Sequence, residues 1–251
     1  FGLSLVAGTA FFLMEYKTPA PMLDLRIFKN KWYSISIFCA FASYVTISCS
    51  NIVLPFYLQN VLGLPPERAG LYMTIYPLVL ALVAPVSGYL SDKFGSEVLT
   101  LIGLSLASGG LFLMGTLGEQ PQYLIMGIYI GLMSLGNGLF QSPNTSLLMS
   151  LVPRDKLGIG GSVNALVRNM GFTLGIALST AILYGGISAK LGYRVSDYVP
   201  GRNDAFVFGM RLTYITAAAI GLAGVLVTAF RLYQRRREKS AAGAGFSAHK
   251  S

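Results

Sequence analysis

The chain has 251 residues, of which 53% are hydrophobic and 12% are charged, whereas an ordinary soluble protein is about 25% charged. With a mean hydropathy of +0.60, this is the composition of a polytopic membrane protein, so estimating soluble domains from length does not apply. The net charge of +9 does not indicate nucleic-acid binding, because the bases lie in loops and in the tail rather than in one patch, as membrane orientation requires.

The first predicted element is an apolar stretch over residues 1–14, which is shorter than the ~20 residues that a membrane-spanning helix needs. It has neither an initiator Met nor a basic signal-peptide region, so we expect the end of a truncated helix and a chain that is a fragment. Residues 15–31 contain Pro19, Pro21 and mixed charges, and they predict a connector on the cytoplasmic side.

Six apolar segments follow, each long enough to cross a bilayer. They lie at 32–58, 69–91, 98–118, 122–151, 158–187 and 205–232. Residues 233–251 are basic and then rich in Ala, Gly and Ser, which predicts a disordered cytoplasmic tail. The sequence therefore predicts an all-α polytopic membrane protein with six complete transmembrane helices in a bundle over 32–232, plus a truncated one.

A short polar stretch, residues 88–95 (GYLSDKFG), joins the second and third spans, and we call it the glycine turn. In this stretch, Gly88 and Gly95 flank an acid, Asp92, and a base, Lys93. A turn this short cannot cross the membrane again. The two helices must therefore lie side by side and antiparallel. The sequence therefore predicts a tight turn at a membrane surface.

The bases predict the orientation of the spans. Thirteen of the 19 bases, Arg231 among them, fall in one set of loops and in the tail; four fall in the other loops, and Arg168 and Arg211 fall within spans. The positive-inside rule then places the glycine turn and the C-terminus in the cytoplasm. The loop over residues 188–204 is expected to face outward.

Arg168 interrupts an otherwise uncharged span about 15 Å from its cytoplasmic end. A charge at that depth costs about 2.5–3.5 kcal/mol on insertion scales, so Arg168 should face the bundle or a water cavity. Asn164 lies one turn earlier on the same face. Two interpretations stay open: a substrate or coupling residue whose acidic partner lies in missing sequence, and a structural Arg that bonds helix-end carbonyls or reaches the surface.

Three amide-type side chains form a polar stripe on the 122–151 span. Asn137, Gln141 and Asn144 recur at i, i+4 and i+7, and Pro143 interrupts the same helix. Because unpaired amides in lipid are costly, the stripe must face protein or water. It can line a cavity, or it can form hydrogen bonds between helices.

Two pairs of glycines have the spacing at which membrane helices approach closely. They are Gly127 with Gly131 and Gly171 with Gly175. We expect both pairs to lie at helix–helix contacts.

The residues that would support catalysis are missing or misplaced. None of the ten acids lies in the middle of a span, and the single His249 lies in the tail. Cys39 and Cys49 are about 15 Å apart along one helix, which is too far for a disulfide. With no nucleophile–base pair, phosphate loop or metal-ligand spacing, we expect no enzyme and no metal or cofactor site.

Several stretches together resemble known transporter sequences. The glycine turn resembles the loop signature G-x-L-a-D-r-x-G-r-k of the major facilitator superfamily, although Ser96 and Glu97 stand where that signature has basic residues. Other stretches resemble the fourteen-helix drug:proton antiporter family of that superfamily. They are residues 21–30 (PMLDLRIFKN), 54–63 (LPFYLQNVLG), 69–71 (AGL), 141–144 (QSPN), 152–153 (VP) and 168–171 (RNMG) with Gly175. The resemblance covers nearly the whole chain except the tail.

This resemblance implies the C-terminal half-bundle of a multi-pass exporter in a bacterial plasma membrane, with the N-terminal half missing. The implied activity is proton-coupled efflux of drugs or other lipophilic small molecules by alternating access, driven by the proton gradient without a cofactor. The implied partners are a small-molecule substrate, protons, the lipid bilayer and the missing half, and not nucleic acid. The implied cytoplasmic gate residues are Gly88, Asp92, Lys93 and Gly95. The expected cavity residues are Asn137, Gln141, Asn144, Asn164 and Arg168.

Other functions stay open at this point. Within transporters, the alternative is a dedicated exporter of one endogenous metabolite, such as a lipid, an antibiotic or a siderophore. From another class, the chain could belong to a non-transporting membrane sensor or assembly partner, which would show no gradient-driven flux. A membrane enzyme is disfavoured because no catalytic groups converge.

Overall fold

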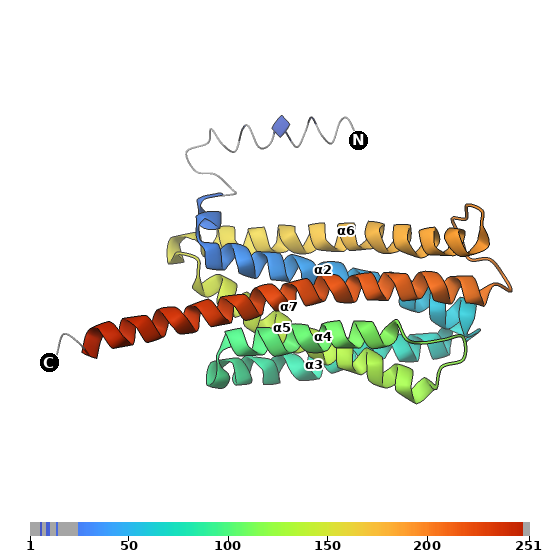
Figure 1. Cartoon of the computed structure of the whole chain (residues 1–251), viewed down its shortest axis with the longest axis horizontal. Helices are drawn as coiled ribbons and strands as arrows, with labels where there is room; N and C mark the ends of the chain where they lie inside the picture. Colours follow the sequence, from blue (N-terminus) through green and yellow to red (C-terminus); the bar gives the residue numbers. More distant parts are fainter. Residues whose placement is uncertain (1–5, 7–8, 11–13, 15–24, 248–251) are drawn as a thin grey trace.

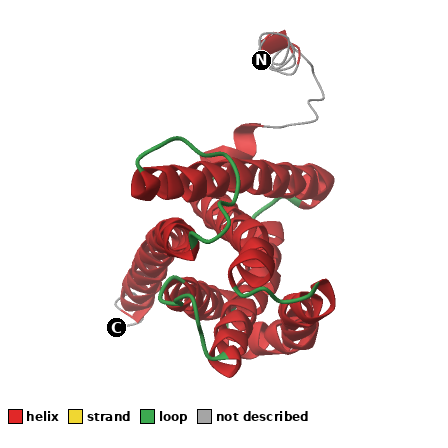
Figure 2. Ribbon diagram, turned by 90° about the vertical axis from the view of Figure 1, so that its right-hand side faces the viewer, coloured by secondary structure: helices red, strands yellow, loops and turns green. Residues whose placement is uncertain are grey.

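The structure is a computed structural model that describes residues 6, 9, 10, 14 and 25–247. Most of the predicted truncated helix over 1–14 and most of the connector over 15–31 therefore lie outside the described residues, although a short 3₁₀ turn (Leu25–Lys29) closes the connector. The described part of the chain consists of helices joined by short loops, without strands (Figures 1 and 2).

Six described helices are long and apolar enough to cross a membrane, which confirms the all-α prediction. They are α2 (Lys31–Phe56, extended by a π-helical turn over Tyr57–Val61), α3 (Pro66–Phe94), α4 (Ser96–Met114), α5 (Tyr123–Ser150), α6 (Leu157–Leu191) and α7 (Asn203–Ser247). Successive helices run in alternating directions along the long axis of the bundle, which is horizontal in Figure 1. We call the end that holds the glycine turn the turn end, and the opposite end, with the loop over 192–202, the loop end.

Local chemistry sets several helix ends. Asn30 caps α2, because its side-chain oxygen accepts a hydrogen bond from the backbone N–H of Trp32 at 3.0 Å. Pro66 occupies the first turn of α3, where a missing N–H costs nothing. Gly192 ends α6 in the left-handed conformation, with φ at 79°.

The helices are not equally buried within the bundle. In the most apolar 18-residue window of α2, 78% of the residues are buried, against 6% in α3. α2 packs against α6 and α7, while α4 packs against α5 and α7. α2 is therefore a central helix, and α3 is a peripheral helix with open faces.

Helices α3 and α4 are consecutive but touch each other little, because α5 packs against both of them. Together α3 and α4 make a V whose apex is Gly95, the single residue between them. The arms of this V hold α5.

Glycines allow the closest helix contacts. A Cβ added to Gly175 would lie 2.6 Å from the carbonyl oxygen of Val45 on α2, and one added to Gly136 would lie 2.7 Å from the carbonyl oxygen of Gly103 on α4. The prediction of close packing is confirmed for Gly171 and Gly175. It is wrong for Gly131, which has open space around it in the described part of the chain, because spacing does not reveal which way a helix face points.

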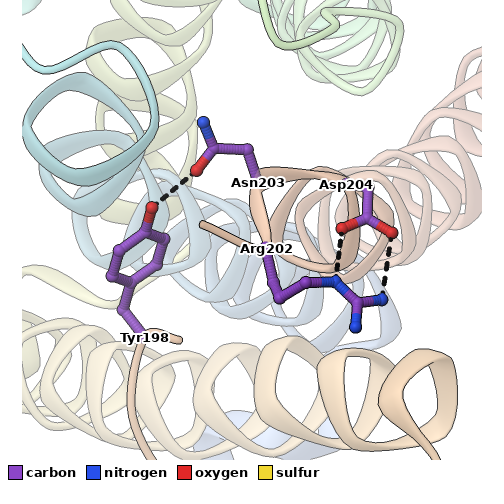
Figure 3. A network of polar contacts seen from close by, with 4 residues as sticks. All are labelled: Tyr198, Arg202, Asn203 and Asp204. Carbon is purple, nitrogen blue, oxygen red and sulfur yellow. Dashed lines mark hydrogen bonds and ion pairs between the residues drawn. The ribbon is translucent and has the colours of Figure 1, made fainter. Parts of the chain in front are cut away.

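Side-chain contacts tie the loop between α6 and α7 to the start of α7, as Figure 3 shows, and Asn203 adds a contact to the end of α2. The Tyr198 hydroxyl donates to Oδ1 of Asn203 at 2.5 Å, and Nδ2 of Asn203 donates to the carbonyl oxygen of Val61 at 3.4 Å. Beside them Arg202 and Asp204 form an ion pair at 3.0 Å. These contacts hold the loop end of α7 against the end of α2.

Helix α7 continues past the predicted end of the last span. The prediction of a disordered tail over 233–251 is corrected for residues 233–247, which are helical, and residues 248–251 lie outside the described residues. The segment holds Arg, Lys, Glu and Ala, which are good helix formers, and extending an existing helix avoids the cost of nucleation.

Candidate functional site

The glycine turn is tighter than its eight residues suggest. Helix α3 runs through Phe94 and α4 begins at Ser96, so only Gly95 is outside a helix. Gly95 has φ 90° and ψ 136°, a conformation that side chains disfavour, and its N–H donates to the Ser91 carbonyl oxygen at 2.9 Å. The Ser91 and Ser96 hydroxyls lie 2.7 Å apart and share a hydrogen bond across the turn.

The predicted gate residues lie together at this turn. Asp92, Lys93 and Gly95 are exposed, and Gly88 is half-buried against α5, where an added Cβ would lie 4.0 Å from the Ser142 hydroxyl. Within the part of the chain that the structure describes, the Asp92 carboxylate has no hydrogen bond or ion pair. The acid is therefore free to pair with a group outside this half-bundle.

Two members of the polar stripe connect α5 to α2. Asn137 is 1% exposed, and its Oδ1 accepts from the Ser43 hydroxyl at 3.3 Å. Asn144 is also buried, and its Nδ2 donates to the Ser36 carbonyl oxygen at 3.3 Å. This geometry favours hydrogen bonding between helices for both residues.

The third member of the stripe differs from the other two. Gln141 is half-buried, and its side chain makes no hydrogen bond within the described residues. Its amide is therefore available to a ligand or to another segment.

Arg168 lies on an open face of α6. Its side chain is exposed, and its guanidinium is close enough to the Tyr44 hydroxyl on α2 to interact with it electrostatically. One turn earlier, Oδ1 of Asn164 is buried and accepts no hydrogen bond within the described residues. Asn164 and Arg168 thus lie one turn apart on α6, and neither takes part in the hydrogen bonds that Asn137 and Asn144 make to α2.

Aromatic side chains from three helices meet beside Arg168. The rings of Tyr44 (α2) and Phe172 (α6) have centroids 5.5 Å apart, and Tyr76 of α3 packs against the same cluster. We call Tyr44, Tyr76 and Phe172 the aromatic patch. Tyr44 is buried, at 8% exposed, whereas Phe172 and Tyr76 are half-buried, so parts of two rings remain accessible near the positive charge of Arg168.

Sequence reasoning missed one buried charge, Arg231. It was counted with the tail bases, but it is 1% exposed and lies inside the bundle at the turn end. Hydropathy assigns the first base after an apolar run to the membrane surface. The available signal was Thr228, three residues earlier on the same helix face, which marks a polar face that continues inward.

Arg211, the second base predicted within a span, lies at the other end of α7. Its Nε donates to the Gly115 carbonyl oxygen, just past the end of α4, at 3.3 Å, and its side chain is exposed. This contact satisfies one of the carbonyls that a helix end leaves unpaired, so it is structural.

Comparisons with known proteins place this arrangement among transporters. The profile of the Major Facilitator Superfamily matches residues 36–251. The chain is 31% identical over 229 residues to the riboflavin transporter RibZ of Clostridioides difficile, covering 91% of this chain and 48% of that protein. It is 28% identical over 194 residues to the multidrug resistance protein Stp of Mycobacterium tuberculosis, covering 77% of this chain and 36% of that protein.

A third relative is the multidrug transporter protein MdtP of Bacillus subtilis, 25% identical over 197 residues, covering 78% of this chain and 36% of that protein. The chain therefore spans about half the length, or less, of the curated relatives it matches.

Proposed function

Because the chain belongs to the major facilitator superfamily, we propose that it forms the C-terminal half of a proton-coupled exporter of lipophilic small molecules. It is a multi-pass membrane protein, and we place it in the cell membrane with the glycine turn and the C-terminus in the cytoplasm. The missing N-terminal half would supply the facing wall of the cavity and the proton-binding acids. Transport would proceed by alternating access, as the two halves rock about the substrate site.

The observation that carries this proposal is the open face around Arg168. An exposed Arg within an apolar helix costs about 2.5–3.5 kcal/mol in lipid, so this face must be covered by protein or water. The half-buried rings of Tyr76 and Phe172 support this assignment, as does the Gln141 amide, which makes no hydrogen bond within the described residues. We assign Gln141, Asn164 and Arg168 to the cavity wall, with Asn137 and Asn144 holding α5 and α2 in place behind it.

The gate role is proposed for the glycine turn. Asp92 is exposed at the end of α3, which supports a role as a latch onto the other half when the cytoplasmic side closes. It is not placed to carry a proton through the membrane, because it lies at the end of α3 rather than in the middle of a span.

Flux through the full-length protein tests the function. Proteoliposomes with an imposed pH gradient should accumulate or release a fluorescent lipophilic dye, and collapsing the gradient with an ionophore should abolish the flux. Gradient-independent flux would exclude proton coupling. No flux of any tested dye or metabolite would favour a sensor or assembly partner instead.

Asp92→Asn removes the charge of the proposed latch and keeps the shape of the side chain. We expect dye efflux to fall at least about fivefold, the lower end of common coupling energies, at equal abundance in the membrane. The matched control is Glu119→Gln, an acid in the loop between α4 and α5. Wild-type efflux by Asp92→Asn would remove the latch role.

Arg168 is tested with Ala and Lys variants by measuring dye binding and efflux. If the guanidinium of Arg168 donates two hydrogen bonds to the substrate, both variants should bind the dye more weakly. Ala loses the charge, and Lys keeps the charge but loses the planar, bidentate donor geometry. We expect about tenfold weaker binding for Arg168→Ala, equivalent to one charged hydrogen bond. Wild-type affinity in both variants would assign Arg168 to structure.

A second candidate is a dedicated exporter of one metabolite. The aromatic patch beside Arg168 favours a planar molecule with polar edges, and the relative of 31% identity is named a riboflavin transporter. Competition in the same proteoliposomes separates the two candidates. Inhibition of dye flux by many unrelated lipophiles supports multidrug efflux, whereas inhibition by flavins alone supports the dedicated exporter.

A further inference from the structure

Arg231 joins three helices at one buried point. Its side chain is 1% exposed, its Nη1 donates to the Ser36 hydroxyl on α2 at 2.6 Å, and its Nη2 donates to the Thr100 hydroxyl on α4 at 3.2 Å. The two ends of the guanidinium fork thus contact two different helices, neither of which is its own.

The two hydroxyls can only accept from Arg231, because their own protons are used elsewhere. The Ser36 hydroxyl donates to the Trp32 carbonyl oxygen at 3.0 Å, and the Thr100 hydroxyl donates to the Glu97 carbonyl oxygen at 2.9 Å. Both bonds lie within the helix that carries the hydroxyl. Removing the guanidinium would therefore leave no hydroxyl proton unpaired, and helices α2 and α4 would keep their internal bonds.

A fourth helix reaches the same point. The Asn144 amide of α5 donates to the Ser36 backbone carbonyl oxygen at 3.3 Å, so Ser36 is contacted from both α5 and α7. On α7, the Thr228 hydroxyl lies 3.3 Å from the thiol of Cys39 on α2. The polar contacts of Arg231 therefore belong to a buried cluster that links α2, α4, α5 and α7.

The cluster lies directly behind the glycine turn. Thr100 is in the second turn of α4, which begins at Ser96 after the single residue Gly95. Glu97, whose carbonyl oxygen is bonded by Thr100, is the second residue of α4. Any shift of Thr100 must move the start of α4 and with it the turn that carries Asp92.

Helix α7 contacts both ends of α4 through arginines. Arg211 bonds the Gly115 carbonyl oxygen at the loop end, and Arg231 bonds Thr100 at the turn end. The two residues are 20 positions apart, about 30 Å along the helix. Only the Arg231 contact is buried and reaches a third helix.

We propose that Arg231 is a positioning residue of the transport cycle, which fixes the start of α4, and through it the glycine turn, to α2 and α7. The inference rests on the proposed transport function, but its structural part can be measured without transport. In this role Arg231 touches neither substrate nor proton. Arg231 holds the turn ends of α2, α4 and α7 in contact, so that the glycine turn moves as a rigid part of the half-bundle and α4 does not bend.

The test compares Arg231→Met, Arg231→Lys and Thr100→Val in the full-length protein, with Arg211→Met as the matched control. Arg211→Met also removes a base from α7 that bonds α4, but at the loop end. Two quantities are measured at equal membrane abundance: gradient-driven dye flux, as maximal rate and KM, and hydrogen–deuterium exchange of the peptide over residues 96–103.

We expect Arg231→Met to lower the maximal rate about tenfold with KM within about twofold, because substrate contacts are unchanged. Exchange over 96–103 should be faster in Arg231→Met and Thr100→Val, and unchanged in Arg211→Met. Arg231→Lys should recover part of the rate, since one ammonium can bond one of the two hydroxyls.

Wild-type rate and exchange in Arg231→Met would overturn the proposal, as would equal effects of Arg211→Met. If Arg231→Met does not reach the membrane, Thr100→Val decides. This variant keeps the charge of Arg231 and removes its contact to α4, together with the hydrogen bond from Thr100 to the Glu97 carbonyl oxygen. Wild-type behaviour in Thr100→Val overturns the proposal. If the wild-type protein moves no dye, the proposed function fails, and the exchange comparison still tests whether Arg231 fixes the turn.

Discussion

Replacing Gly175 by Ala tests the close contact between α6 and α2. The added Cβ would lie 2.6 Å from the Val45 carbonyl oxygen and 2.6 Å from the Ser48 Cβ, where real contacts are essentially never below 3.0 Å. The helices must therefore separate by at least about 0.4 Å, and by about 0.8 Å to reach ordinary contact. Overpacking of this kind costs about 1–3 kcal/mol, since backbone and not a flexible side chain is in the way.

The matched control is Gly185→Ala on the same helix, where nothing lies within 4 Å of the added Cβ. Both changes gain the same helix propensity, about 1 kcal/mol, so the difference between them isolates packing. Equilibrium unfolding of the full-length protein in mixed micelles should show Gly175→Ala less stable than Gly185→Ala by about 1–3 kcal/mol. Equal stabilities would refute the close contact between α2 and α6.

Two further changes test the ends of the bundle. Gly95→Ala should destabilise the protein by about 1–3 kcal/mol in the same unfolding assay, because φ is 90° there and no neighbour lies within 4 Å to cause a clash; a neutral result would contradict that backbone conformation. Tyr57→Phe should cost about 0.5–1.5 kcal/mol, because the buried Tyr57 hydroxyl donates to the Gly118 carbonyl oxygen at 2.6 Å, and an unchanged stability would place that hydroxyl in contact with water.

The number and order of the spans could be predicted, because apolar length alone decides which segments can cross a bilayer. Their orientation in the membrane stays a prediction. The helix ends could not be predicted. The second span was expected over 69–91, but α3 runs from Pro66 to Phe94. Hydropathy detects where apolar residues stop, whereas a helix stops where its hydrogen bonding does, and Asp92 and Lys93 continue the helix as polar residues.

The candidate site stays a prediction, although the structure shows how its residues lie. The charge of Arg168 predicts a side chain that faces the bundle or a water cavity, and in the structure that side chain is exposed on α6. The polar stripe on α5 was identified as a set, but its spacing could not separate Asn137 and Asn144, which bond to α2, from Gln141, which makes no hydrogen bond within the described residues. The burial of Arg231 was not predicted, because burial depends on which helices pack around a residue, and the hydropathy of one span does not identify those helices.

The V formed by α3 and α4 limits how this half can move. With one residue at its apex, the two arms cannot slide past each other, because Gly95 fixes their axial offset. α5 contacts both arms, which touch each other little. The lateral hold on α3 and α4 therefore comes mainly from a third helix and not from their own mutual contact, so the geometry of the turn at Gly95 depends on α5 as well as on the chain connection.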